Sequence, residues 1–359
     1  MTVRGETWGV ARGSARGLPM RASIGLLLAT LVVPGLPAPA AAQAVGDVFR
    51  QVSPSVLVIR SRGRDVSASG QVRFGEIGSG VLISADGKVM TAAHVVHAMD
   101  EITVEFIGGE TVPAGVVASE PAADLSLIQL ERVPAGVKVA RLADSGSVRV
   151  GDRVLIVGAP YGLAYSLSVG YISARWPPNS VYPAFPLAEF FQTDATINTG
   201  NSGGPMFSAA GEVIGIVSHN ISKGGGSEGL GFVVTINTAK DLLLARRSIW
   251  SGLEGHTLSG DLAAIFNLPQ PEGFLVKTVA KNSPAEQAGI RGGTKTATID
   301  GQTLVVGGDV LLAVEGIPTG NLADYNRMRE HLQGLPPGAP ITVTVLRAGR
   351  VLHLVGKAP

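Results

Sequence analysis

Residues 200–205 read Gly200-Asn201-Ser202-Gly203-Gly204-Pro205, a serine flanked by three glycines within six residues. Glycine lets the backbone approach a ligand closely and adopt a positive φ, and a nucleophilic serine needs both. The N–H of Ser202 and that of Gly200 can converge on one oxygen, which is the oxyanion-hole arrangement of acyl transfer. The alternative is a glycine-rich turn with an incidental serine. We take the stretch to predict a serine nucleophile.

A serine hydroxyl is a weak nucleophile and needs a base and an orienting acid. His94 directly follows the apolar run Val89–Thr91 and two small alanines, which leave room for a partner. Asp124 precedes the apolar run Leu125–Leu130, and an acid buried at the edge of such a run requires a partner. Taken singly, the histidine could be structural and the aspartate a strand-start cap. Together with Ser202 they predict a Ser-His-Asp triad.

The chain between Asp47 and Val234 alternates short strands with turns, which is typical of an all-β sandwich or barrel. The strongest strand candidates are Ser55–Ile59, Val81–Ile83, Val89–Met90, Ile102–Phe106, Leu125–Leu130, Val154–Val157, Val169–Ser173, Val213–Val217 and Gly231–Val234. The pattern then changes. Ala239–Arg247 lacks Gly and Pro and predicts a short helix, where we place a domain boundary.

The segment after Trp250 mixes short strands with helical stretches. Ser283–Gly289 begins with a Ser cap and ends at glycine, and a second helix follows Asn321. A hairpin turning at Ala348-Gly349 closes the chain. We therefore expect a signal peptide (1–44), a protease domain (45–238), a helical linker (239–249) and a small α+β domain (250–359).

Composition excludes several other classes of function. The 359 residues are 45% hydrophobic and only 16% charged, with a formal net charge of +1. A nucleic-acid-binding charge field is therefore not expected. Cysteine is absent, which excludes disulfides, thiolate metal sites and cysteine nucleophiles. The remaining histidines show no metal-ligand spacing, so we expect no metal site.

The N-terminal segment, residues 1–44, has the features of a secretory signal peptide. Arg21 precedes the apolar run Ile24–Val33, and the small residues Ala40–Ala44 provide an A-x-A cleavage site. The apolar run is about half of the ~20 residues that a membrane-spanning helix needs, so a stable membrane span is not expected. An uncleaved anchor is the alternative. We predict a periplasmic or secreted protein.

Three strings give the chain a family resemblance: TAAHVV around His94, ADLSLIQL around Asp124 and DATINTGNSGGP around Ser202. The order of these motifs and the residues in them resemble those of the HtrA/Deg family of trypsin-like serine proteases. The resemblance implies a mostly β fold with a chymotrypsin-like double β-barrel. It also implies cleavage of unfolded polypeptides without ATP or any other cofactor, and assembly as a homotrimer. By position, Ile197 would line the substrate pocket.

Residues from Trp250 onward resemble a protease-associated PDZ domain. Trp250-Ser251-Gly252-Leu253 stands where the family has its carboxylate-binding loop, although Ser251 replaces the usual hydrophobic residue. The resemblance implies that backbone N–H groups there receive peptide C-termini. The alternatives are a small domain without peptide binding, and a binding module or holdase chaperone with little basal proteolysis.

Overall fold

The computed structural model describes residues 45–67 and 70–358. The predicted signal peptide, residues 1–44, lies outside the described residues. Within the described ranges, no helix is long and apolar enough to span a bilayer. The first element is helix α1 (Val45–Val52), which buries Val48 and Val52.

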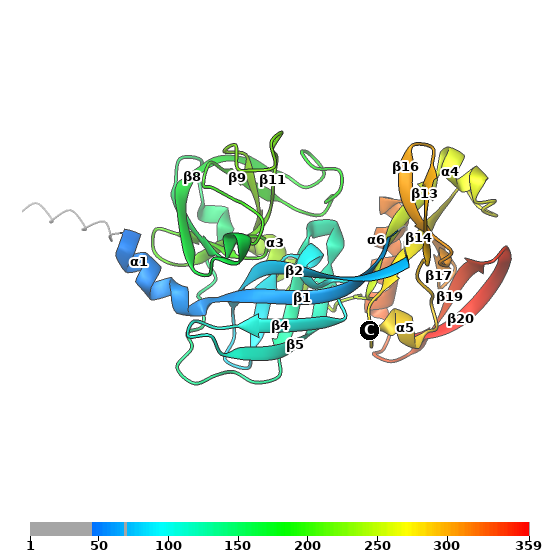
Figure 1. The fold of residues 1–359 in the computed structure, drawn as a ribbon, viewed down its shortest axis with the longest axis horizontal. Helices are drawn as coiled ribbons and strands as arrows, with labels where there is room; N and C mark the ends of the chain where they lie inside the picture. The colour runs from blue at the N-terminus through cyan, green and yellow to red at the C-terminus, as the bar shows by residue number, and fades with distance from the viewer. Residues whose placement is uncertain (1–44, 68–69, 359) are drawn as a thin grey trace, which may run out of the picture. The chain divides into compact units, whose positions relative to one another are not determined.

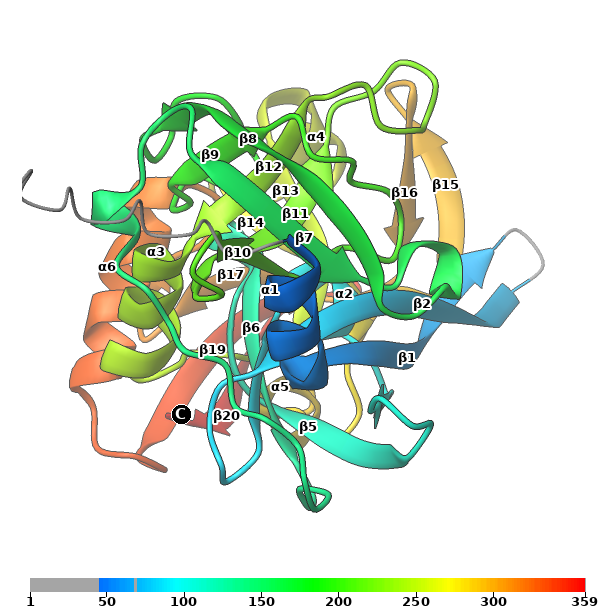
Figure 2. The same cartoon turned by 90° about the vertical axis from the view of Figure 1, so that its left-hand side faces the viewer.

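Six strands close into a first barrel in the order β1-β2-β3-β6-β5-β4 (Figures 1 and 2). Their bounds are β1 (Val56–Ser67), β2 (Gly70–Leu82), β3 (Lys88–Thr91), β4 (Glu101–Glu105), β5 (Thr111–Glu120) and β6 (Leu125–Leu130). In β4 the buried Ile102 and Val104 alternate with more exposed neighbours, as in a strand with one face toward a core. They pack with Leu57, Ile59 and Phe106 inside the barrel. Helix α2 (Ala93–Val96) follows β3.

Six further strands close into a second barrel in the order β10-β11-β12-β9-β8-β7. They are β7 (Arg153–Gly158), β8 (Ser166–Trp176), β9 (Phe190–Thr193), β10 (Pro205–Ser208), β11 (Val213–Asn220) and β12 (Gly231–Thr235). A separate apolar cluster joins the two barrels, with Met90 and Leu125 from the first and Leu155 and Phe207 from the second. This shared core holds the elements that carry His94, Asp124 and Ser202 next to one another.

The C-terminal part forms a mixed sheet-and-helix unit. Helix α3 (Ile236–Lys240) continues into a π-helical turn, η5 (Asp241–Ala245), and leads to a sheet of order β13-β14-β17-β19-β20, with β18 paired to β17. The strands are β13 (Leu253–Ser259), β14 (Glu272–Val279), β17 (Val310–Val314), β18 (Ile317–Pro318), β19 (Pro340–Arg347) and β20 (Arg350–Lys357). A separate hairpin pairs β15 (Lys295–Ile299) with β16 (Gln302–Val306), and the helices are α4 (Gly260–Ile265), α5 (Pro284–Gln287) and α6 (Leu322–Gly334). Short 3₁₀ turns complete the fold at Ser53–Ser55, Pro121–Ala123, Ser145–Ser147 and Pro160–Gly162.

Local signals explain several of these boundaries. The Ser283 hydroxyl accepts a hydrogen bond from the Glu286 N–H at 3.2 Å and caps α5, and Asn321 caps α6 in the same way. Ala348 and Gly349 have φ of 49° and 76°, the two positive values of a type I′ turn, which suits the β19–β20 hairpin.

The predicted fold class is confirmed: the chain is mostly β and contains two closed barrels. Each strand expected from the sequence falls on an observed strand, but within the two barrels β5, β9 and β10 were missed, and no ranges were predicted for β13 to β18. β5 was missed because it contains Pro113, Ala114 and Gly115, which disfavour strands. The linker helix begins at Ile236 rather than Ala239 and ends at Ala245.

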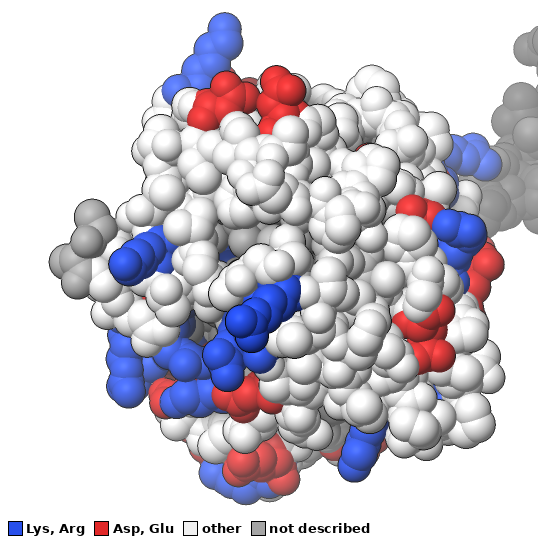
Figure 3. Space-filling model, turned by 90° about the vertical axis from the view of Figure 1, so that its right-hand side faces the viewer, with Lys and Arg blue, Asp and Glu red and all other residues white. Residues whose placement is uncertain are grey.

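Figure 3 shows one face of the molecule, on which charged residues form small groups of both signs between wide uncharged areas. This distribution agrees with the low charged fraction of 16%. A face of this kind produces no extended field of a single sign.

Candidate active site

Ser202 lies in the loop between β9 and β10, and Gly200 gives that loop its shape. Gly200 has a φ of +101°, and a Cβ at this position would lie 2.2 Å from the Ala159 carbonyl oxygen. Thr199 C=O accepts a hydrogen bond from Tyr161 N–H at 2.8 Å. Because C=O and N–H point in opposite directions across a trans peptide, Gly200 N–H points away from Tyr161. Within the described part of the chain, neither this N–H nor that of Ser202 donates to a protein acceptor, so both can receive an oxygen.

Asp124 holds His94 in one orientation. The Asp124 side chain is only 1% exposed, and its oxygens lie 2.9 and 3.0 Å from His94 Nδ1. The carboxylate also accepts a hydrogen bond from the backbone N–H of His94 at 3.1 Å. A carboxylate can only accept, so Nδ1 carries the proton and Nε2 of neutral His94 is left as an acceptor.

The pKa of His94 is raised above its ordinary value. Burial by itself would lower this pKa, but the Asp124 carboxylate raises it by charge attraction and by its hydrogen bond, and Glu76 adds a smaller attraction. The 47% exposed side chain leaves the ring open on its other side. This environment allows His94 to take up a proton and stabilises the imidazolium that results.

The hydroxyl of Ser202 donates to the Ser218 carbonyl at 3.1 Å, and among the described residues no hydrogen bond joins it to His94. Catalytic hydrogen bonds are often long or absent without substrate. The structure therefore brings His94 and Asp124 into direct contact, with Ser202 linked to them through Ser218.

Ser218 is a site residue that the sequence analysis missed. Its hydroxyl donates to Asp124 Oδ2, so the hydroxyl oxygen accepts from the N–H of His219 Nδ1 at 3.0 Å. The ring of His219 stacks on Phe232 with centroids 5.1 Å apart and lies 4.1 Å from the ring of Tyr182. Burial in this cluster lowers the pKa of His219 to about 4, although Asp124 opposes the shift. His219 is therefore neutral at neutral pH. The available signal for Ser218 was its place directly after the predicted strand Val213–Val217.

Ser79 is a second missed residue, and it is fully buried. Its hydroxyl donates to the Gly200 carbonyl at 2.7 Å and accepts from Ala159 N–H at 2.9 Å. Its backbone N–H donates to the Ser202 carbonyl at 2.8 Å. Ser79 thus connects strand β2 of the first barrel to the nucleophile loop. The available sequence signal for Ser79 was the short string Gly78-Ser79-Gly80, which does not indicate its hydrogen-bond partners.

Ile197 is 1% exposed and belongs to the core of the second barrel. It packs against Gly231, where an added Cβ would lie 2.6 Å from the Ile197 side chain. Its expected role in lining a substrate pocket stays a prediction.

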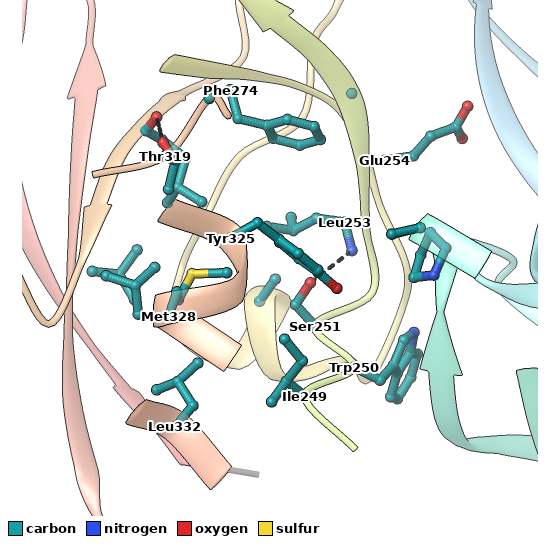
Figure 4. A pocket seen from close by; sticks show the side chains of 18 of the residues that line it. Ile249, Trp250, Ser251, Leu253, Glu254, Phe274, Thr319, Tyr325, Met328 and Leu332 are labelled. Carbon is teal, nitrogen blue, oxygen red and sulfur yellow. Dashed lines mark hydrogen bonds between the residues drawn. The ribbon is translucent and has the colours of Figure 1, made fainter. Parts of the chain in front are cut away.

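A groove of about 640 Å³ lies beside the predicted carboxylate loop. Trp250, Ser251 and Leu253 line it, and Gly252 between them has a φ of +77°. Figure 4 shows Tyr325, Met328 and Leu332 of α6, together with Phe274 and Ile249, around the same space. The lining is largely apolar and suits an extended peptide with apolar side chains. Among the described residues, no group of three His, Asp or Glu side chains is placed to hold a metal ion.

The part of the chain that carries this site is similar to known peptidases. Residues 78–216 match the trypsin-like peptidase domain. The chain is 36% identical over 263 residues to a probable periplasmic serine endoprotease DegP-like of Pseudomonas putida (strain GB-1), covering 70% of this chain and 53% of the relative. A protein of the same description from Hahella chejuensis (strain KCTC 2396) is 34% identical over 294 residues, covering 79% of this chain and 57% of the relative. The chain thus spans about half the length of the curated relatives it matches.

Solved structures give the same result over more of the chain. The HtrA-type protease AlgW with a decapeptide has a TM-score of 0.51 and 26% identity, covering 88% of this chain and 98% of that one. AlgW with a tripeptide has a TM-score of 0.51 and 27% identity, covering 88% and 96%. The resemblance to the HtrA/Deg family of trypsin-like serine proteases is therefore confirmed, with residues 78–216 as the trypsin-like peptidase domain.

Proposed function

We propose that the chain is an exported, ATP-independent serine endopeptidase that degrades unfolded or damaged envelope proteins. Ser202 is the nucleophile, His94 the general base and Asp124 the group that orients it. The observation that carries the proposal is the buried Asp124 carboxylate at 2.9 Å from His94 Nδ1, since it leaves Nε2 as an acceptor on the open side of the ring.

The reaction follows from these positions. Ser202 Oγ attacks the scissile carbonyl while His94 Nε2 takes the hydroxyl proton, and the protonated imidazole then gives that proton to the leaving amine. The N–H groups of Gly200 and Ser202, which have no acceptor within the described chain, hold the oxyanion. Water repeats the sequence on the acyl-enzyme and releases Ser202. No cofactor enters these steps.

The C-terminal part is proposed to act as a PDZ domain that receives peptide C-termini. β13 is an edge strand of its sheet and lies at the groove, so that an extended peptide can add to it as a further strand. The loop Trp250–Leu253 would hold the terminal carboxylate. Export to the periplasm is part of the same proposal, supported by the periplasmic description of the relatives. Assembly as a homotrimer is proposed from the family resemblance alone.

The neutral Asn201 supports activity without a newly cut N-terminus. Trypsin-like zymogens carry an aspartate before the serine, and that aspartate pairs with the new N-terminus on activation. Asn201 is 4% exposed and carries no charge to form such an ion pair. We expect activity in the absence of any internal processing, as checked by mass spectrometry of the active protein.

A second candidate is a binding module or holdase chaperone with little basal proteolysis. The hydrogen bond from Ser202 Oγ to the Ser218 carbonyl favours it, because the nucleophile in this state is not engaged with His94. The test uses unfolded casein with the exported chain and with Ser202→Ala, each with and without short C-terminal peptides. Cleavage that is lost in the variant supports the protease. Casein kept soluble and uncut by both proteins supports the holdase.

A further inference from the structure

The edge of β13 presents one pair of backbone groups next to the carboxylate loop. Gly252 C=O accepts from Ala280 N–H at 2.9 Å, on the β14 side. Leu253 is paired with Val279, one position further along the antiparallel register. Along an antiparallel strand, the N–H and C=O groups of successive residues point alternately toward the partner strand and away from it. Those of Leu253 therefore point to the free edge. An added peptide would need these groups for its first contacts.

The side chain of His97, from the first barrel, already donates a hydrogen bond to the Leu253 carbonyl. His97 Nε2 lies 2.7 Å from that oxygen. A carbonyl only accepts, so Nε2 carries the proton, and Nδ1 accepts from the Ser119 hydroxyl at 2.9 Å. The backbone carbonyl of His97 in turn accepts from Trp250 Nε1–H at 3.0 Å. One residue of the protease part therefore holds two residues of the loop.

Ser251 occupies the other free-edge group. The N–H of Leu253 donates to the Ser251 hydroxyl at 3.4 Å, a long contact that Figure 4 marks. This hydroxyl is the side chain that departs from the hydrophobic residue usual at the position. Both polar groups that Leu253 offers at the free edge are thus satisfied within the chain.

The His97 imidazole and the Ser251 hydroxyl lie where the C-terminal residue of an added peptide would bind. An added strand lies about 4.8 Å from its neighbour and brings its N–H to about 2.9 Å from the accepting carbonyl. A ring whose Nε2 is 2.7 Å from the Leu253 oxygen lies in that space. A free carboxylate at the loop would likewise compete with the Ser251 hydroxyl for the N–H of Leu253.

We propose that the terminal subsite of the groove is closed by the chain itself, and that a peptide C-terminus enters only by displacing the imidazole of His97 from the Leu253 carbonyl. This inference rests on the proposed peptide-binding function. His97 directly follows α2, the turn that carries His94, so ligand entry releases a contact three residues from the proposed base. His97 is a positioning residue and does not touch the reacting atoms.

Binding of a defined probe tests the proposal. The probe is a set of fluorescein-labelled octapeptides with free C-termini, each ending in a different apolar residue, together with their C-terminal amides. Their Kd values are measured by fluorescence anisotropy on the exported full chain in a Ser202→Ala background, so that no peptide is cleaved. His97→Ala should bind the free-carboxylate peptides about 2- to 10-fold more tightly, which is the net worth of one hydrogen bond.

Two further variants keep this test specific. His97→Gln restores a neutral N–H donor and should return Kd toward that of the parent. His353→Ala removes a histidine on β20 that bonds only to Thr344 in the described chain, and should leave Kd unchanged. Thermal unfolding of each variant verifies that it is folded.

The outcomes separate this inference from the proposed function. Tighter binding in His97→Ala alone, with the amides discriminated against, supports the inference. Equal or weaker binding in His97→Ala overturns it while leaving peptide recognition intact. If no peptide binds any variant, both the inference and the PDZ role fail, whereas casein cleavage by the active chain continues to test the protease separately.

Discussion

Ser79→Ala is the substitution that most directly tests how the nucleophile loop is held. A single buried hydroxyl connects Gly200 C=O, at 2.7 Å, with Ala159 N–H, at 2.9 Å. Alanine leaves both backbone groups buried without these partners. An unsatisfied buried group costs about 1–3 kcal/mol, so we expect the free energy of unfolding to fall by about 2–6 kcal/mol.

The effect on catalysis should be of comparable size. Ser79 joins Gly200 to the segment that carries Tyr161, whose N–H orients the peptide before Gly200. Freeing that peptide lets the Gly200 N–H turn away from the oxyanion. Loss of one oxyanion donor costs about 10²–10³ in kcat, so we expect a decrease of up to about 10²-fold with little change in KM.

The assay is hydrolysis of a fluorogenic peptide derived from a casein cleavage site, combined with thermal unfolding followed by circular dichroism. Ser147→Ala is the matched control, because Ser147 donates a single exposed hydrogen bond, to the Asp144 carbonyl at 2.8 Å. The control should keep both kcat and stability. If Ser79→Ala kept the parental kcat while losing stability, the Gly200 donor would not depend on Ser79 and the reasoning would be refuted.

Charged and polar groups elsewhere in the chain and at the site give four further tests. His94 must be neutral to accept the proton, and Asp124 raises its pKa, so activity should be lost as pH falls through a value above 6.5. Asp124→Asn should lower kcat by about 10⁴-fold and move this acid limb to lower pH, and an unmoved limb would contradict His94 as the base. Ser218→Ala deletes a hydroxyl that donates to Asp124, and should lower kcat by about 10-fold on the same peptide; an unchanged kcat would exclude a positioning role. Glu120→Ala leaves the buried Arg329 guanidinium unpaired and should lower the free energy of unfolding, measured by urea titration, by about 3–5 kcal/mol. The double variant Glu120→Leu with Arg329→Met should recover most of this loss. A double variant as unstable as the two single losses added together would argue against the pair.

The sequence predicted those features whose cause is local. Ser202, His94 and Asp124 were predicted from the few residues that neighbour each of them. The starts of α5 and α6 were predicted from their capping residues, Ser283 and Asn321. The alternation of short strands and turns was sufficient to predict an all-β sandwich or barrel, whereas the double barrel was implied by the family resemblance. These signals span only a few neighbouring positions, so no knowledge of distant contacts was needed.

The residues that were missed act through contacts that are distant in sequence. Ser79 bonds to Gly200, which is 121 positions away, and Ser218 bonds to Asp124 across 94 positions. His97 reaches Leu253 across 156 positions. Serine and histidine are ordinary surface and turn residues, so only the folded partners distinguish these three from the rest. The direction of the Ser202 hydroxyl is likewise a rotamer choice that depends on the Ser218 carbonyl.

His94 and His97 show how strongly partners decide chemistry in this chain. His94 lies in the short helix α2 and His97 directly follows it, yet their pKa values move in opposite directions. Burial lowers the pKa of His97, and the Leu253 carbonyl offsets only part of that effect. Burial also acts on His94, but the Asp124 carboxylate outweighs it. A carboxylate makes one imidazole a base that can carry charge, whereas a hydroxyl and a carbonyl keep the other as a neutral donor of fixed tautomer. Because His97 follows His94 by three residues, the proposed displacement of the His97 ring by a peptide would act close to the backbone that positions His94.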